Sequence, residues 1–267
     1  MRAPVGRLAF ALLATVLTAA CAGRRLPLST DPSEPLQNVA SAHARVAEAC
    51  RSVRTMTAEL TLSGRVGRQR IRGRVLAGFA QPDAMRLEGL APFGAPAFIL
   101  VSRGGSATLV LPRENAVLRS ASPDSVLEAL TGVALAPEDL LAVLTGCVDA
   151  GAEPESGRRH SGGWATITLR GGTVLFLRRV SDEWVLQAAQ RGAWQIEYLA
   201  WQGRFPSIVT LRSGSPQAVQ IDLRAAVSQV QANVDLEADA FAVTVSPAAR
   251  ALSIDDLRAA GPLRGEP

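Results

Sequence analysis

The strongest constraint on the fold is an alternation of apolar and polar residues with a period of two, which begins at residue 57. In residues 57–66 every second residue is apolar or glycine, and the residues between them are polar. Residues 68–79 repeat this pattern, with arginines at Arg70, Arg72 and Arg74 between the apolar positions. Successive side chains of a β-strand point to opposite faces of the sheet. The pattern therefore predicts two adjacent strands with one apolar face and one solvated face.

Residues 81–112 predict three more strands joined by turns. Residues 98–101 are apolar on both faces, as in a central strand, and the Gly-Gly pair at 104–105 is typical of a tight hairpin. The turn at 91–96 contains Phe93, a large aromatic residue where turns usually hold polar ones. An exposed Phe at the rim of a sheet indicates contact with lipid or with a partner. The alternative is that Phe93 folds back onto the core.

Three segments predict helices. Residues 36–56 carry apolar residues three or four positions apart, as on one side of an amphipathic helix. His43 lies on that stripe, and we interpret it as a core or lid histidine, because the only other histidine, His160, lies in a polar stretch. Two short helices are predicted from Ser122-Pro123 and Pro137-Glu138, where proline and an acidic residue mark a helix start.

Strand patterns resume at residue 164 after the polar stretch 150–163, which we interpret as a loop, and the last two patterns are 218–223 and 230–236. The fold class is therefore mainly β with α. These patterns amount to about eleven antiparallel strands. A sheet of that size curls, so we expect a barrel or half-barrel. The one-sided helices would form a lid over an apolar cavity on its concave side. The residues after 246 predict a weak helix and then a frayed end.

The N-terminus predicts export and lipidation. Residues 1–20 have two arginines followed by a short apolar run, as in a signal peptide. The sequence Leu17-Thr18-Ala19-Ala20-Cys21 resembles a bacterial lipoprotein cleavage box, which implies acyl chains on Cys21; the alternative is an ordinary signal peptide with a chance Cys. Ala22 after the Cys implies sorting to the outer membrane. The expected organisation is a signal peptide (1–20), a lipidated tether (21–35), a half-barrel domain (36–246) and a tail (247–267).

Composition argues against several classes of function. All 28 basic residues are arginine, the net charge is only +4, and aromatic residues make up 4% of the chain. A nucleic-acid surface needs a basic stripe and stacking aromatics, so we expect no nucleic acid as a partner. We interpret the arginines of residues 68–79 as a solvated face, with an anionic-lipid or nucleic-acid patch as the alternative.

Catalysis finds little support in the sequence. There is no GxSxG, HExxH or CxxC motif and no phosphate-binding glycine loop, and two separate histidines cannot form a metal cluster. We therefore expect no enzyme activity, no catalytic residue, no metal and no cofactor other than covalent lipid on Cys21. Cys50 and Cys147 lie at the ends of predicted helices in an exported chain. They form either a disulfide or two buried free thiols.

Several short motifs together resemble the LolA/LolB superfamily of lipoprotein carriers. They are the cleavage box, the tether and helix, and the segment 82–88 leading into Ala91-Pro92-Phe93-Gly94, which is similar to the turn of the outer-membrane lipoprotein receptor branch. The run 130–135 with 140–146, and the pair 194–198 with 205–208, match later helices and strands of that family. The resemblance implies an unclosed β-barrel with a helical lid over a cavity for acyl chains. It also implies that Phe93 dips into the membrane.

From this resemblance we expect a monomeric, lipid-anchored protein on the periplasmic face of the outer membrane. It would receive acylated lipoprotein cargo from a LolA-like periplasmic carrier, shield it as a chaperone does, and insert it into outer-membrane lipid. The alternatives are a carrier or sensor of another lipid, and a non-catalytic partner in an envelope complex. The expected cavity-lining residues are inward sheet positions and lid contacts: Leu60, Leu62, Ile71, Val75, Leu87, Phe98, Leu100, Val46 and Leu140.

Overall fold

The computed structural model describes residues 33–213 and 220–264. Residues 31–267 form one compact unit with its own core, separate from a second unit, residues 1–30. The predicted signal peptide 1–20, the lipidation site Cys21 and residues 21–32 of the predicted tether lie outside the described residues.

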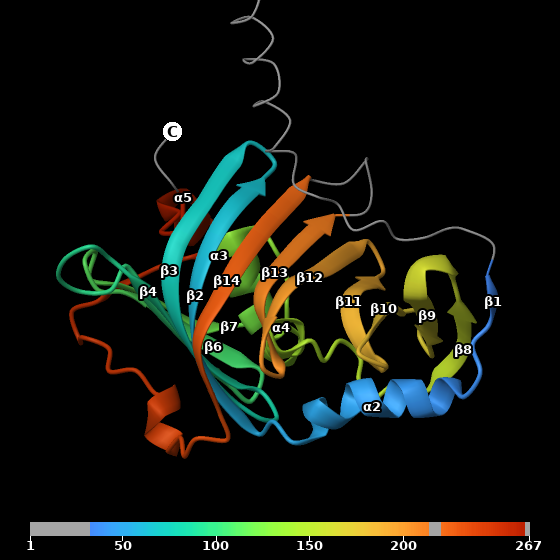
Figure 1. The fold of residues 1–267 in the computed structure, drawn as a ribbon. Coiled ribbons are helices and arrows are strands. Elements are labelled where there is room, and N and C mark those ends of the chain that lie inside the picture. The colour runs from blue at the N-terminus through green and yellow to red at the C-terminus, as the bar shows by residue number, and fades with distance from the viewer. Residues whose placement is uncertain (1–32, 214–219, 265–267) are drawn as a thin grey trace, which may run out of the picture. The chain divides into compact units, whose positions relative to one another are not determined.

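Within the described residues, one sheet of fifteen strands makes up most of the compact unit (Figure 1). The strands are β1 (Glu34–Pro35), β2 (Thr55–Val66), β3 (Gln69–Ala80), β4 (Ala84–Leu90), β5 (Phe98–Arg103), β6 (Ser106–Leu111), β7 (Ala116–Ala121), β8 (Pro154–Arg159), β9 (Trp164–Leu169), β10 (Val174–Val180), β11 (Glu183–Arg191), β12 (Trp194–Gln202), β13 (Phe205–Ser213), β14 (Ile221–Ala232) and β15 (Arg250–Ala251). Their spatial order is β1-β8-β9-β10-β11-β12-β13-β14-β2-β3-β4-β5-β6-β7-β15. The sheet is open, because β1 and β15 are its two edges and do not pair with each other.

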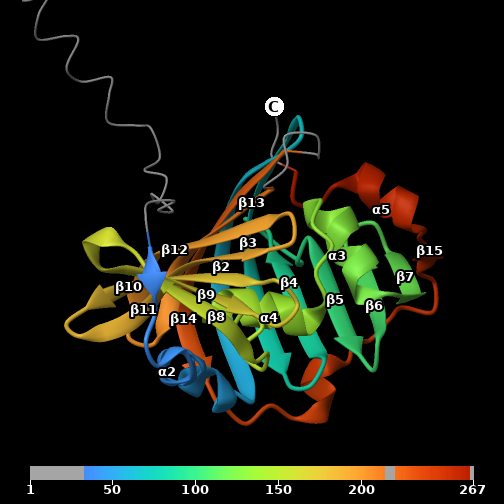
Figure 2. The ribbon, with the colours of Figure 1, turned by 90° about the vertical axis from the view of Figure 1, so that its right-hand side faces the viewer.

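The described helices are α2 (Val39–Arg51), α3 (Pro123–Thr131), α4 (Pro137–Thr145) and α5 (Ile254–Ala260), with short 3₁₀ turns at Ser161–Gly163 and Ala238–Phe241. Figure 2 shows α3 and α4 on the concave side of the curled sheet. Helix α2 contacts β8 and β11, and α3 contacts α5 and β6. Each described helix is too short or too polar to span a bilayer.

Strands β2 and β3 follow the predicted alternation. They pair antiparallel in register from Thr55↔Ala80 to Val66↔Gln69 around a two-residue turn. The register keeps the apolar sets together, because Leu60 pairs with Val75 and Val75 pairs with Gly89 of β4. The inward residues of these strands belong to one apolar core with residues of α3 and α4. Most of their outward residues face solvent on the convex side, and Glu59 is the buried exception.

The two short helices begin where the sequence predicted. Both have proline in their first turn, where its missing N–H is not needed, and both have an acidic residue there. Both end at a glycine in the left-handed region, Gly132 with φ 78° and Gly146 with φ 75°. An L-residue with a side chain rarely adopts this conformation, so these glycines stop the helices.

Several expected boundaries were wrong. The strand number is fifteen in the described part of the chain, more than the roughly eleven expected. The stretch 150–163 contains strand β8, which lies next to the edge strand β1. Both faces of β8 are largely exposed, so its sequence shows no apolar alternation. The predicted strands 218–223 and 230–236 are one strand, β14, which ends at Ala232. The first helix spans only Val39–Arg51, because the residues from Thr55 onward pair with β3 and β14.

The weak helix predicted after residue 246 is present as α5, but the residues that follow it, up to 264, pack onto the unit instead of fraying. Strand β15 runs parallel to β7, and Leu257 of α5 is fully buried. Ser253 caps α5 through a capping box with Asp256. Arg264 forms an isolated bridge with Ile71 of β3, so this end reaches back to the first long hairpin.

Candidate functional site

An apolar pocket of about 110 Å³ lies between the inner face of the sheet and helices α3 and α4. Only Thr131 and Arg224 among its lining residues are not apolar. The lining residues are Leu60, Leu62, Ile71, Val75, Leu87, Phe98, Leu127, Leu130, Thr131, Val133, Leu135, Leu140, Val143, Leu144, Val209, Leu211, Leu223, Arg224, Ala225 and Leu263.

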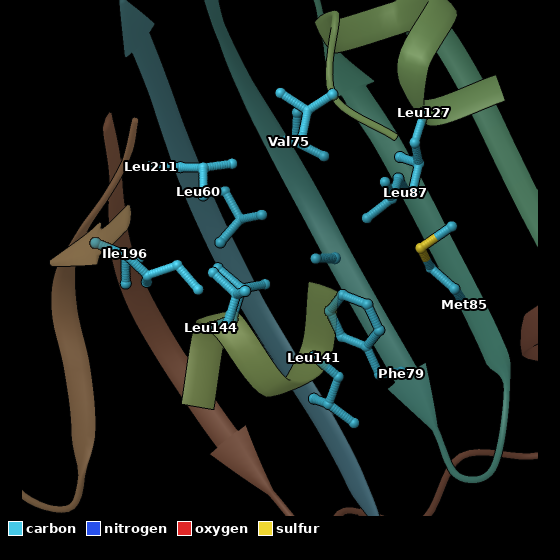
Figure 3. Close-up of a cluster of buried hydrophobic side chains, with 14 of the residues drawn as sticks. Leu60, Val75, Phe79, Met85, Leu87, Leu127, Leu141, Leu144, Ile196 and Leu211 are labelled. Carbon is cyan, nitrogen blue, oxygen red and sulfur yellow. The ribbon is translucent and has the colours of Figure 1, made fainter. Parts of the chain in front are cut away.

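The strands supply the floor of the pocket through their inward positions. Leu60, Val75 and Leu87 come from β2, β3 and β4, and Figure 3 shows them converging on the side chains of the helices. Gly89 lies opposite Phe98 in the β4–β5 register. A Cβ at Gly89 would lie 2.3 Å from the Phe98 ring, so this glycine is what allows the ring to lie against β4.

The helices close the other side of the pocket. Leu127 and Leu130 come from α3, whereas Val143 and Leu144 come from α4 (Figure 3 labels Leu127 and Leu144). These side chains line the pocket because both helices are amphipathic and turn an apolar side toward the sheet. The pocket is therefore enclosed by two short amphipathic helices and the linker between them, residues 132–136.

The chemistry of the pocket is that of apolar contact. The hydroxyl of Thr131 donates to the carbonyl oxygen of Leu127 at 2.7 Å, so it is already satisfied within α3. Arg224 is exposed, on the strand between Leu223 and Ala225. Among the described residues there is no group of three His, Cys, Asp or Glu that could hold a metal ion. A ligand with a long hydrocarbon segment is the kind of molecule that such a surface favours.

Seven of the residues expected to line a cavity are brought together at this pocket: Leu60, Leu62, Ile71, Val75, Leu87, Phe98 and Leu140. Two are elsewhere. Leu100 is fully buried beside its register partner Leu109, where β6 is covered by α3 and the core is filled. Val46 lies on α2, which packs against β8 and β11, and it borders a separate space of about 10 Å³.

Sequence reasoning missed the lining residues from the second half of the chain. Val209, Leu211 and Leu223 reach the pocket because β14 pairs with β2 and β13 pairs with β14. Their alternation was visible in the sequence, but the pairing of β14 with β2 was not. Leu263 lies beyond α5 and shows no local signal of its place.

Phe93 lies at the turn between β4 and β5 and is 88% exposed. The guanidinium of Arg113, from the turn between β6 and β7, donates to the backbone carbonyl oxygen of Phe93. This contact holds the backbone of the turn and leaves the aromatic ring in solvent. The alternative in which Phe93 folds back onto the core is therefore wrong.

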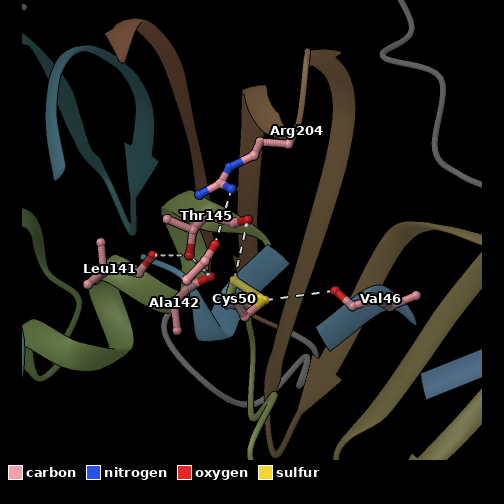
Figure 4. The surroundings of a disulfide bond; sticks show 8 residues. Val46, Cys50, Leu141, Ala142, Thr145 and Arg204 are labelled. Atoms are coloured by element: carbon pink, nitrogen blue, oxygen red, sulfur yellow. Dashed lines mark hydrogen bonds between the residues drawn. A yellow bond between two sulfur atoms is a disulfide. The ribbon is translucent and has the colours of Figure 1, made fainter. Parts of the chain in front are cut away.

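Cys50 and Cys147 form a disulfide, with 5.5 Å between their Cα atoms (Figure 4). Cys50 is in the last turn of α2, and Cys147 directly follows Gly146, which ends α4. The bond therefore ties the end of α4 to α2. Nearby, His43 of α2 is buried, and its Nε2 has no hydrogen-bond partner in the described structure. Burial, and then the positive charge of Arg51, lower the pKa of His43 below 6.5.

No protein-family model and no curated protein matches the sequence. The fold does match solved structures. A DUF1329 family protein from Desulfovibrio piger is similar over 78% of this chain and 98% of its own, with a TM-score of 0.50 and 13% sequence identity. A LolA superfamily protein from Nitrosomonas europaea is similar over 76% of this chain and 98% of its own, with a TM-score of 0.52 and 9% identity. The chain therefore has the LolA/LolB-like fold that its sequence motifs predicted.

Proposed function

We propose that this protein is a lipid-anchored receptor of the bacterial outer membrane that binds the acyl chains of lipoproteins in the apolar pocket. It receives them from a LolA-like periplasmic carrier and releases them into the outer membrane. The observation that carries the proposal is the pocket itself, which is lined almost entirely by apolar residues and lies on the concave face of a LolA/LolB-like fold. The process involves binding and release without covalent chemistry.

The pocket must enlarge to accept an acyl chain. Its volume of about 110 Å³ is below the roughly 300–1,000 Å³ of most small-molecule sites. The sheet is held by continuous backbone pairing, so the helices are the side that can move. In this proposal α3 and α4 act as a lid that moves away from the sheet when the chain enters.

The disulfide determines which part of the lid moves. Cys147 holds the C-terminal end of α4 against α2, which itself packs on β8 and β11. The linker 132–136 between the two helices contains no regular structure and begins at Gly132. Opening therefore occurs at α3 and the linker, with the end of α4 as the fixed point.

Release into the bilayer is assigned to the turn that carries Phe93. An exposed aromatic ring forfeits the burial free energy that lipid would supply, which is roughly 1.5–3 kcal/mol for a fully buried Phe side chain. Insertion of the ring would bring the end of the sheet that carries the β4–β5 turn to the membrane surface. The predicted acyl chains on Cys21 would keep the protein at that surface between rounds of transfer.

Native mass spectrometry of the protein from the periplasm tests the proposal. A chain that begins at residue 31, the start of the compact unit, is exported without the anchor and purified in mild detergent. We expect a bound mass that fragments to acylated polypeptide. Leu62→Trp fills the pocket and should abolish this mass, whereas Leu76→Trp, at a leucine that is 42% exposed on the convex face, should retain it.

The other outcomes separate the alternatives. A bound mass that is a free lipid would replace the lipoprotein cargo with another lipid and keep the pocket as its site. A protein that is free of bound mass, and that also fails to take up added fatty acids, would contradict the proposal. The domain would then be left as a non-catalytic partner within an envelope complex.

A further inference from the structure

The hairpin formed by β2 and β3 carries an unusual concentration of positive charge. Between Glu59 and Asp83 the sequence has five arginines and no acidic residue. One of the five, Arg74, forms an ion pair with Glu59 at 2.6 Å. The other four, Arg65, Arg68, Arg70 and Arg72, are exposed, and we call them the hairpin arginines.

The hairpin arginines have no counter-charge in the described part of the chain. No carboxylate there forms an ion pair with any of them. The nearest acid by strand register is Asp222, opposite Arg65 on β14, but it is paired with the Nε of Arg212 at 3.2 Å.

Two of these arginines also repel each other. Arg65 and Arg70 are direct register partners across the β2–β3 ladder, on the same convex face. Like charges directly opposite each other in a sheet destabilise it. The fold therefore maintains an unfavourable pair that an external anion would relieve.

The hairpin arginines lie at the same end of the sheet as Phe93, and the pocket opens toward this end. In an antiparallel sheet alternate turns lie at the same end, so the β2–β3 turn shares its end with the β4–β5 turn of Phe93. Figure 1 shows the hairpin reaching beyond the neighbouring strand β14. On the inner face the pocket becomes more open in this direction, since Leu60 is 4% exposed whereas Leu62, two residues closer to the turn, is only half-buried.

We propose that the hairpin arginines bind the phosphate groups of anionic lipids and orient the open end of the pocket toward the membrane. This inference rests on the proposed function, because it assigns the membrane that receives the cargo to this end of the sheet. Guanidinium groups match phosphate oxygens in geometry and charge. Phe93 supplies the apolar contact, and the arginines supply the electrostatic one.

The expected strength follows from the number of arginines. Each arginine close to an anionic surface strengthens binding roughly fivefold, so three of them contribute about 100-fold. The attraction is screened by salt, since the Debye length falls from about 10 Å at 0.1 M to about 3 Å at 1 M.

Vesicle flotation tests this inference with the chain that begins at residue 31, which has no lipid anchor to mask the effect. The vesicles are phosphatidylcholine alone or with a third of phosphatidylglycerol. The triple variant Arg65→Gln, Arg70→Gln, Arg72→Gln should bind the anionic vesicles about 100-fold more weakly than the wild type. The charge-matched control Arg45→Gln, Arg54→Gln, Arg103→Gln changes exposed arginines away from the hairpin and should bind as the wild type does.

Two further measurements distinguish membrane binding from effects on stability and from acyl binding in the pocket. Arg70→Gln should raise the urea midpoint, because it removes the repulsion with Arg65. The triple variant should keep its acyl-bound mass in native mass spectrometry, so a failure of acyl binding in the wild type would count against the pocket and leave the vesicle result standing. Equal binding of wild type and triple variant to anionic vesicles, or equal binding of the wild type to both vesicle types, would overturn the inference.

Discussion

Removal of the disulfide should lower the stability of the compact unit by several kcal/mol. Cys50 and Cys147 are separated by 97 positions in the sequence. In the chain-entropy model, closing a loop of that length removes about 4.7 kcal/mol of unfolded-state entropy, and native disulfides typically contribute roughly 2–5 kcal/mol. The double variant Cys50→Ser, Cys147→Ser should therefore unfold at a lower urea concentration, with a loss of about 2–5 kcal/mol.

Urea unfolding followed by tryptophan fluorescence measures this loss. The oxidised wild type is compared with the double variant and with the wild type in reducing agent, and the last two should coincide. The same change should speed acyl uptake, because the end of α4 is no longer tied to α2. A loss below about 1 kcal/mol would show that the bond does not constrain the chain. An unchanged rate of uptake would refute its role as the fixed point of the lid.

Three further predictions concern single side chains. Because burial and Arg51 lower the pKa of His43, the unfolded chain binds more protons than the folded one below pH 6.5. The free energy of unfolding should therefore fall as the pH is lowered from 7 to 5.5. Urea titrations of His43→Gln should lack this pH-dependent component. Tyr198 is buried, and its hydroxyl has no hydrogen-bond partner among the described residues; Tyr198→Phe should thus leave the thermal midpoint unchanged or raise it, and a clear decrease would reveal a partner. Phe93→Glu should reduce lipoprotein delivery to membranes while acyl binding stays intact, whereas Val180→Glu, at an apolar residue that is 49% exposed at the opposite end of the sheet, should have no effect in the same transfer assay.

Local patterns predicted the elements that rely on local physics. The alternation in 57–79 predicted β2 and β3 because one of their faces packs against the core and the other is mostly solvated. Pro123 and Pro137 predicted the starts of α3 and α4, since proline fits a first helical turn. Phe93 was predicted to be exposed because it lies in a turn at the rim of the sheet, and its side chain is 88% exposed.

Features that depend on tertiary pairing were harder to predict. Strand β8 forms because it pairs with β9 on one side and with β1 on the other, and its exposed faces leave no pattern in the sequence. Leu100 follows the same alternation as Leu87, but α3 covers its end of the sheet and fills the space. Which inward residues surround a cavity is decided by where the helices pack, and strand periodicity does not carry that information.

Photo-crosslinking maps the acyl site most directly. A fatty acid with a diazirine at its chain end is added to the chain that begins at residue 31, irradiated, and the modified peptides are identified by mass spectrometry. We expect adducts on inward residues of β2 and β3 between Leu60 and Val75 and on α3 and α4 between Leu127 and Leu144. Leu62→Trp should remove them, and Leu76→Trp should not. Adducts confined to the convex face, or adducts that persist in Leu62→Trp, would contradict the claim that this pocket holds the acyl chain.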